Sequence, residues 1–186
     1  MYNLDLINRK RYVRKETRSK LNNQALEEAL VKSRSIKGKL FRLSEFKLAK
    51  LVMFYASMED EVNTKDMIEE ALEMGKVVVL PRSVGKEIVP KEIKKYADLE
   101  KASFGIYEPR EKLRNVNPKE IDLVVVPGVA FDEKKTRLGR GKGYYDRFLS
   151  KLPVDKVTVG LAFDFQIVRN LPKDSHDISV SIVLTN

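Results

Sequence analysis

Leu-Val-Met-Phe-Tyr at residues 51–55 and Val-Val-Val-Leu at residues 77–80 are two short apolar runs. The segment between them has helix signals. Asn63 is suited to cap a helix that reaches Met74, and Gly75 follows at the position where a left-handed residue commonly ends a helix. A strand, a helix and a second strand in this order form a βαβ unit, which implies parallel pairing with a right-handed crossover. We predict that this unit starts a mostly parallel sheet, and that Pro81 ends its second strand.

Further apolar runs continue the alternation of strands and helices toward the C-terminus. Residues 121–126 read as a third buried strand. A helix is expected over residues 144–152, because its apolar positions recur at i, i+3, i+4 and i+7. Strands follow at residues 157–162 and 178–184. The pattern predicts an α/β fold with a mostly parallel, Rossmann-like sheet and helices on both faces.

The N-terminal part of the chain is expected to be a helical segment. Residues 2–20 contain neither proline nor glycine, so a helix is favoured there. A second helix is expected over residues 23–36, broken by Gly38, and Ser44 is placed as the N-cap of a short helix over residues 45–50.

The first expected helix carries a stripe of cations. Lys10, Arg14 and Arg18 are spaced at i, i+4 and i+8, so they stack along one helical face. Like charges at this spacing repel one another, and bound anions would relieve the repulsion. The alternative is a basic helix face that is simply solvated.

Length and composition limit the class of protein. The chain has 186 residues, which suits one domain over residues 1–186. It has no cysteine and one histidine, which excludes disulfides and thiol nucleophiles and argues against zinc. Without a membrane-length apolar run or a signal peptide, we expect a cytoplasmic protein that does not bind membranes. The formal net charge of +9 favours polyanionic partners, such as nucleic acid, nucleotides or polycarboxylates.

The strongest chemical signal is Arg137-Leu138-Gly139-Arg140-Gly141-Lys142-Gly143-Tyr144-Tyr145-Asp146-Arg147, whose residues 139–143 are called the glycine loop below. Glycine permits close backbone approach and free choice of φ, so consecutive N–H groups can point at one anion. Cations surround these glycines, which favours phosphate. A flexible basic surface loop is the alternative, but two adjacent tyrosines have no use in a linker.

The glycine spacing does not match the common nucleotide motifs. A P-loop requires Gly-x4-Gly-Lys-Ser/Thr, which is missing here. The dinucleotide fingerprint is Gly-x-Gly-x-x-Gly directly after a strand, whereas this loop has Gly-x-Gly-x-Gly and follows its strand only after residues 127–136. The residues therefore predict a phosphate site of another design and leave the phosphate compound unidentified.

Polar groups follow three expected strands and should meet at one edge of the sheet. They are Glu61, the glycine loop and residues 163–166. Glu61 is either a substrate contact or a solvated residue ahead of a helix. Asp146 either interacts with the dipole of its own helix or binds Mg²⁺ beside a phosphate. Asp177 adjoins His176, which as a lone histidine is most often a bystander.

With these residues in view, the whole chain resembles the 5-formyltetrahydrofolate cyclo-ligase family, also called methenyltetrahydrofolate synthetases. The centre of the resemblance is Pro127-Gly128-Val129-Ala130-Phe131-Asp132, followed by the stretch 137–147. The family's nucleotide-contacting Lys-x-x-x-Arg is similar to Lys10 and Arg14. In place of the glycine that often precedes the family's Arg-Leu-Gly element, this chain has Thr136, so the local turn differs.

Three further segments carry the resemblance. The family's Ser-x-x-x-Glu-x-x-Thr is similar to the segment from Ser57 to Thr64, in which Glu61 is the folate-contacting acid. Its late His/Asn-Asp pair is similar to residues 176–177, and Phe104 stands where some members carry tryptophan near the pterin.

The resemblance implies an ATP- and Mg²⁺-dependent conversion of 5-formyltetrahydrofolate to 5,10-methenyltetrahydrofolate, with release of ADP and phosphate. It implies catalytic roles for Arg140, Lys142 and Tyr144. ATP is expected to contact Lys10, Arg14, Arg137, Leu138, Gly139, Arg140, Gly141, Lys142, Gly143, Tyr144 and Tyr145. The folate is expected to contact Glu61, Phe104, Arg140, Gly141, Lys142, Gly143 and Tyr144. Mg²⁺ is expected to bind Asp146 and Asp177.

Two other functions stay open at this point. A nucleic-acid-binding module agrees with the charge, although no recognised motif is present and the basic residues are spread along the chain. A different α/β enzyme could use the glycine loop for a sugar phosphate or coenzyme A. We expect small-molecule substrates, no nucleic acid and a monomer, and the positive charge suits a polyglutamylated folate tail.

Overall fold

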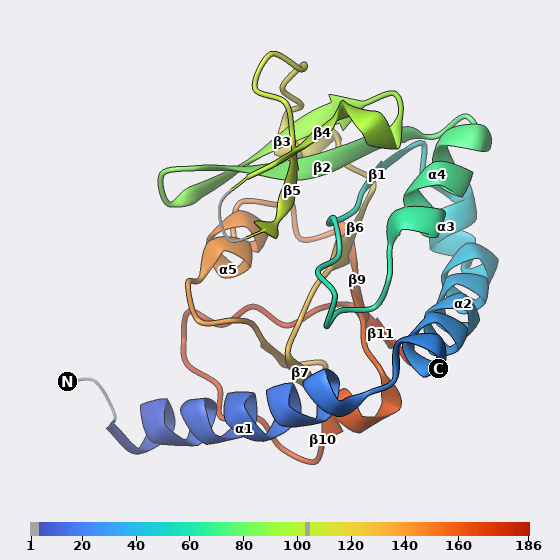
Figure 1. Ribbon diagram of the computed structural model, residues 1–186. Coiled ribbons are helices and arrows are strands. Elements are labelled where there is room, and N and C mark those ends of the chain that lie inside the picture. Colours follow the sequence, from blue (N-terminus) through green and yellow to red (C-terminus); the bar gives the residue numbers. More distant parts are fainter. Residues whose placement is uncertain (1–3, 103–104) are drawn as a thin grey trace.

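The computed structural model describes residues 4–102 and 105–186. Its centre is a six-stranded sheet with the order β11-β9-β6-β1-β2-β3 (Figure 1). All neighbours in this sheet pair parallel except β2 and β3, so the prediction of a mostly parallel sheet is confirmed. The strands are β1 Leu51–Met53, β2 Val77–Val84, β3 Glu87–Ile93, β6 Leu123–Val126, β9 Val157–Leu161 and β11 Ile182–Leu184.

Side chains alternate between the two faces of this sheet, as the pleat of a strand requires. In β6, Leu123 and Val125 join one buried cluster, and Val124 and Val126 join the other. The first cluster includes residues of α2, α3 and α4, and the second includes Phe148 of α5. Helices therefore cover both faces, as predicted. Their bounds are α2 Leu26–Arg42, α3 Ser44–Leu48, α4 Lys65–Glu73 and α5 Tyr144–Leu149.

The N-terminal helix α1, Leu4–Asn23, lies against a smaller sheet of three strands. This sheet has the order β10-β7-β8, its strands alternate along the chain with the last strands of the main sheet, and α1 contacts β7 (Figure 1). Val13 of α1 packs on its buried residues Ala130 and Leu138. The α1 helix is thereby held against a part of the chain that comes more than 100 residues later. The strands are β7 Ala130–Asp132, β8 Arg137–Leu138 and β10 Ile167–Val168.

Two predictions about the N-terminal helices are wrong. Gly38 does not break α2, which continues to Arg42. A helical glycine costs about 1 kcal/mol relative to alanine, and the complete burial of Ile36 and Leu40 on either side outweighs that cost. Ser44 is not an N-cap but the first residue of α3, and its hydroxyl donates to Glu45.

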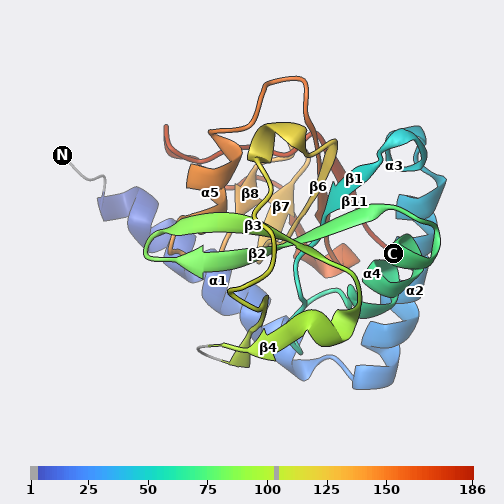
Figure 2. The same ribbon diagram turned by 90° about the horizontal axis from the view of Figure 1, so that it is seen from above.

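The prediction that Pro81 ends the second strand is also wrong, because β2 runs on to Val84 and pairs antiparallel with β3. Pro81 lies opposite Pro90 in this hairpin. Opposed residues in an antiparallel pair exchange either both hydrogen bonds or neither, so two prolines fit where neither N–H is needed. Seen from above, the β2–β3 hairpin reaches toward α5 (Figure 2), and α5 contacts β3.

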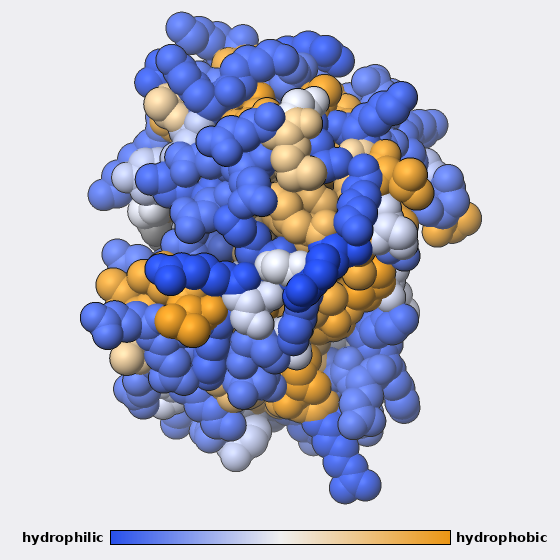
Figure 3. Space-filling view, turned by 90° about the vertical axis from the view of Figure 1, so that its right-hand side faces the viewer, coloured by the Kyte–Doolittle hydropathy of each residue, from blue (hydrophilic) through white to orange (hydrophobic). Residues whose placement is uncertain are grey.

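The remaining elements are short. They are the paired strands β4 Leu99–Lys101 and β5 Tyr107–Pro109, and the single turns η1 Tyr96–Asp98, η3 Pro118–Glu120 and η4 Asp164–Gln166. Hydrophilic side chains cover most of the face on which α2, α3 and α4 lie (Figure 3). Within residues 4–102 and 105–186, no helix has the length and apolar character to cross a membrane.

Candidate active site

A cleft of about 850 Å³ lies between α1, the β2–β3 hairpin, the glycine loop and the segment that follows β1. It gathers the site residues expected from the sequence, although these come from distant parts of the chain. Phe104 is the exception, because it lies outside the described residues. The expected residues that line the cleft are Lys10, Arg14, Glu61, Arg137, Leu138, Gly139, Arg140, Gly141, Lys142, Gly143, Tyr144, Tyr145, Asp146 and Asp177.

At each glycine position of the glycine loop, steric contact or backbone conformation disfavours any other residue. Gly141 and Gly143 have φ values of 102° and 67°, in the left-handed region that disfavours residues with a Cβ. A Cβ on Gly139 would lie 2.7 Å from a guanidinium nitrogen of Arg137. The loop between β8 and α5 therefore has a defined shape that other residues could not maintain.

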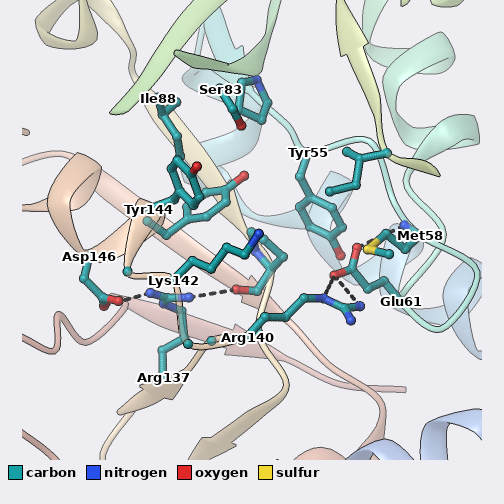
Figure 4. A pocket seen from close by; sticks show the side chains of 18 of the residues that line it. Tyr55, Met58, Glu61, Ser83, Ile88, Arg137, Arg140, Lys142, Tyr144 and Asp146 are labelled. Atoms are coloured by element: carbon teal, nitrogen blue, oxygen red, sulfur yellow. Dashed lines mark hydrogen bonds and ion pairs between the residues drawn. The ribbon is translucent and has the colours of Figure 1, made fainter. Parts of the chain in front are cut away.

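Arg137 and Asp146 form an ion pair at the floor of the cleft (Figure 4). Arg137 Nη2 donates to Asp146 Oδ1 at 2.7 Å, and the Arg137 side chain is only 3% exposed. The guanidinium also lies 5.7 Å from the centre of the Tyr145 ring, within cation–π range. The backbone N–H of Ile178 donates to the same oxygen of Asp146 at 3.3 Å, which brings the segment containing Asp177 beside α5.

Glu61 and Arg140 form a second ion pair on the other side of the cleft (Figure 4). Glu61 Oε1 accepts from Arg140 Nε at 3.2 Å and from Nη2 at 3.1 Å. Glu61 Oε2 accepts from the backbone N–H of Met58 at 3.0 Å. Burial raises the pKa of Glu61, and the charge of Arg140 opposes this rise. Glu61 is thus a deeply placed carboxylate and not a solvated residue ahead of a helix.

The loop that carries Glu61 is closed at its base by Ser57 and Thr64. The N–H of each donates to the hydroxyl of the other, both at 3.2 Å. The Thr64 hydroxyl in turn donates to the carbonyl oxygen of Tyr55 at 2.5 Å. The serine and threonine of this segment therefore have a structural purpose, which is to present Glu61 at a fixed place beyond β1.

The two adjacent tyrosines differ in their hydroxyl contacts. Tyr144 donates to the carbonyl oxygen of Gly85 at 3.0 Å, so it links α5 to the tip of the β2–β3 hairpin. The Tyr145 hydroxyl is buried and has no hydrogen-bond partner within the described part of the chain. Burial raises the pKa of Tyr145, so the hydroxyl stays protonated and is a potential donor.

The cation stripe of α1 faces the cleft, with Lys10, Arg14 and Arg18 all lining it. Lys10 pairs with Asp177, and Arg14 Nε donates to the carbonyl oxygen of Gly139 at 2.8 Å. Burial lowers the pKa of Arg14. Lys10 and Arg14 are therefore not part of a solvated helix face, whereas Arg18 is exposed, and α1 supplies one wall of the cleft.

Comparison with known proteins decides the family. The family model of the 5-formyltetrahydrofolate cyclo-ligases matches residues 6–186. The chain belongs to the 5-formyltetrahydrofolate cyclo-ligase family. It is 33% identical to the mouse cyclo-ligase, with 94% of this chain and 92% of the relative covered. The Haemophilus influenzae cyclo-ligase is also 33% identical, with 81% and 83% covered.

Solved structures agree with this assignment. The Aquifex aeolicus 5,10-methenyltetrahydrofolate synthetase is similar with a TM-score of 0.84 and 38% identity, covering 94% of this chain and 88% of that one. The Mycoplasma pneumoniae 5,10-methenyltetrahydrofolate synthetase gives a TM-score of 0.78 and 25% identity, covering 95% and 98%. As a cyclo-ligase the protein is a ligase of folate metabolism, and small-molecule substrates are consistent with this family.

The cyclo-ligase cleft also contains residues that the sequence did not reveal. Ser83, Gly85 and Ile88 of the hairpin region line it, as does Tyr55. A proline commonly ends a strand, so Pro81 hides the hairpin in the sequence, although β2 continues through it. Residues 163–166, which were expected at the same edge, do not line the cleft; Gln166 instead donates to the carbonyl oxygens of Gly128 and Val129, both at 3.0 Å.

The expected metal ligands of the cyclo-ligase, Asp146 and Asp177, both line the cleft. Across residues 4–102 and 105–186, no group of three or more His, Cys, Asp or Glu side chains is placed to hold a metal by itself. The His176 side chain is 91% exposed and pairs with Asp174. In the part of the chain that the structure describes, Asp146 and Asp177 are each paired with a cation and do not belong to a closed metal cage.

Proposed function

We propose that the protein joins N10 to the formyl carbon of 5-formyltetrahydrofolate in a reaction that uses ATP and Mg²⁺. The observation that carries the proposal is the cleft itself. One space contains the glycine loop with its cations, a largely buried carboxylate at Glu61 and the cation stripe of α1. The cations are the contacts that a phosphorylated nucleotide needs, and the carboxylate is a contact that a neutral heterocycle with N–H groups needs.

The chemistry agrees with a chain that has no cysteine. An N-formyl group is an unreactive amide whose oxygen is a poor leaving group. Attack of this oxygen on the γ-phosphorus of ATP releases ADP and converts the oxygen into a phosphate leaving group. The N10 amine then attacks the formyl carbon, the C–O bond breaks, and phosphate and the N10 proton depart. Such steps need positioning and charge neutralisation more than a protein nucleophile.

The cations of the cleft suit the transferred phosphoryl group. Arg140 and Lys142 project from the glycine loop, while Lys10 and Arg14 approach from α1. Charge-assisted hydrogen bonds to phosphate contribute about 1.5–3 kcal/mol each. We assign Arg140 and Lys142 to the group being transferred and Lys10, Arg14 and Arg137 to the charge of the rest of the nucleotide.

The carboxylates fit Mg²⁺ when it arrives with a phosphate. Asp146 uses Oδ1 for Arg137 and Ile178, and Asp177 uses Oδ2 for Lys10 and Asp174. This leaves Asp146 Oδ2 and Asp177 Oδ1 without a hydrogen bond to the described chain. Mg²⁺ prefers one or two carboxylates together with substrate phosphates and water. Bound there, it would neutralise charge on the nucleotide, while Asp146 and Asp177 would keep it on that side of the cleft.

Glu61 and the tyrosines suit the folate. A carboxylate has about four acceptor sites, and Glu61 uses three of them for Arg140 and Met58, which leaves one on Oε2 for an N–H of the pterin edge. Glu61 is fixed by the closed base of its loop. The hydroxyl of Tyr144 is committed to Gly85, whereas that of Tyr145 lacks a partner among the described residues. We therefore assign Tyr145 to the formyl oxygen and give Tyr144 the task of holding the hairpin against α5.

The test is the absorbance of the methenyl product formed from 5-formyltetrahydrofolate by the purified protein. We expect product only when both ATP and Mg²⁺ are present, with one ADP released for each turnover. Arg140→Met serves as the inactive control. Absence of product, or product formed without ATP, would overturn the proposal.

A further inference from the structure

Arg140 is held by two carboxylates, only one of which lines the cleft. Besides its bonds to Glu61, Arg140 Nη2 donates to Asp60 Oδ1 at 2.6 Å, the shortest of its three contacts. The Asp60 side chain is 19% exposed and the Glu61 side chain 15%. Neither the glycine-loop pattern nor the proposed folate contacts account for Asp60.

The planar shape of the guanidinium group determines which of its edges is occupied and which stays open. A guanidinium is planar and carries its five N–H donors in a fixed fork. Asp60 and Glu61 together occupy Nε and Nη2, which form one edge. Nη1 makes no hydrogen bond to any described residue. Because Arg140 lines the cleft, its unoccupied edge is the one left for a ligand oxygen.

Closure of the loop does not explain Asp60. Ser57 and Thr64 already join the two ends of that loop by reciprocal hydrogen bonds. The Asp60 carboxylate instead reaches a residue 80 positions away in the chain. One arginine facing two acids also leaves an excess negative charge, which is a poor arrangement for stability alone.

We propose that Asp60 is a positioning residue, which fixes the guanidinium plane of Arg140 so that its Nη1 edge faces the phosphoryl group being transferred. With Glu61 alone, the guanidinium could pivot about that carboxylate and lose its alignment. The inference rests on the proposed function, because it places Arg140 at the reacting phosphate. Misplacement of a catalytic group by about 1 Å can cost roughly 100-fold in rate.

The experiment compares Asp60→Ala and Asp60→Asn with Glu59→Gln, which removes an exposed acid from the adjacent position. For Asp60→Ala, we expect kcat to fall by roughly 10- to 100-fold while KM for ATP changes by less than about threefold. Asp60→Asn should recover part of kcat, because its amide oxygen can still accept from Nη2. Glu59→Gln should match the unmodified protein.

The pH profile separates positioning from a loss of folded protein. Asp60, Arg140, Tyr55 and Tyr145 are the charged or titratable groups that face Glu61. Removing the charge of Asp60 removes a like charge beside Glu61. In Asp60→Asn, the acidic limb of kcat/KM for the folate should therefore move to lower pH, which a folding defect would not cause.

The outcomes are distinct. If the unmodified protein makes no methenyl product, the proposed function fails. If it is active and Asp60→Ala has an unchanged kcat, the inference about Asp60 fails while the function stands. A loss of kcat that equals the unfolded fraction measured by circular dichroism, with an unmoved acidic limb in Asp60→Asn, also overturns the inference.

Discussion

Arg14 Nε donates to the carbonyl oxygen of Gly139 across 2.8 Å, joining α1 to the glycine loop over 125 positions of sequence. Arg14→Ala removes this bond and a cation from the cleft. Since a charge-assisted bond contributes about 1.5–3 kcal/mol, we expect KM for ATP to rise by about 10- to 100-fold. Steady-state kinetics measures this, with Arg11→Ala on the exposed side of α1 as the control. Equal KM values for the two variants would contradict the assignment of Arg14 to ATP.

Asp146→Asn keeps an oxygen that accepts from Arg137 but removes the charge expected to bind Mg²⁺. We expect the Mg²⁺ concentration for half-maximal rate to rise by about tenfold or more, because Mg²⁺ depends on carboxylate charge. A titration of initial rate against Mg²⁺ at saturating ATP checks this. Asp155→Asn is the control, since Asp155 is exposed and does not line the cleft. An unchanged requirement would remove Asp146 from the metal site.

The largely buried carboxylate of Glu61 predicts that activity depends on pH. Burial raises its pKa above the ordinary value for glutamate of about 4.3. If the ionised form accepts an N–H of the pterin edge, kcat/KM for the folate is complete above this raised pKa and falls as the pH drops through it. Glu61→Gln should lower kcat/KM and abolish the acidic limb. A variant with the same acidic limb would show that another group titrates.

The two tyrosines should respond differently to loss of the hydroxyl. Tyr144→Phe removes a hydrogen bond to Gly85, so the free energy of unfolding should fall by about 0.5–1.5 kcal/mol. Tyr145→Phe removes a buried hydroxyl that has no partner in the described structure, so stability should stay the same or rise. Its kcat/KM for the folate should nevertheless fall by about tenfold. Urea denaturation and kinetics test the pair, and a full-activity Tyr145→Phe would contradict the assignment.

Two glycine substitutions should change stability in opposite directions. A Cβ at Gly160 would lie 2.5 Å from the fully buried ring of Phe131, so Gly160→Ala should cost about 1–3 kcal/mol through overpacking. At Gly38, inside α2, the nearest atom to a new Cβ is 3.7 Å away. Gly38→Ala should therefore add about 0.5–1 kcal/mol and raise Tm by about 1–4 °C. Thermal unfolding measures both, and a destabilised Gly38→Ala would be evidence against the helix continuing there.

The sheet could be predicted because buried parallel strands have a simple signature. The valine-rich runs at residues 77–80 and 123–126 have no polar face, as strands covered on both sides require. The predictions of a strand end at Pro81 and a helix break at Gly38 failed for the same reason. The effect of a proline or glycine depends on its partners in space, here Pro90 across the hairpin and the buried residues beside Gly38.

The candidate site was predictable only where its residues adjoin in sequence. The glycine loop could be recognised because its glycines and cations lie within one short stretch. The bond between Arg140 and Asp60 spans 80 positions, and nothing in the local sequence of either residue indicates it. The part of the cleft wall formed by Ser83 and Ile88 could not be predicted either. These two residue types have no sequence signal for a binding site, and only the pairing of β2 with β3 places them at the cleft.

The position of α1 has a consequence for synthesis of the protein on the ribosome. Lys10 pairs with Asp177, a partner 167 positions later, so the wall of the cleft that α1 supplies is translated well before the segment that anchors it. Contacts of such long range carry a large loop-closure cost and form late in folding. A nascent chain can therefore build β1, β2, β3 and β6 before α1 has its partner, and the ATP binding that we propose would report that translation has passed Asp177.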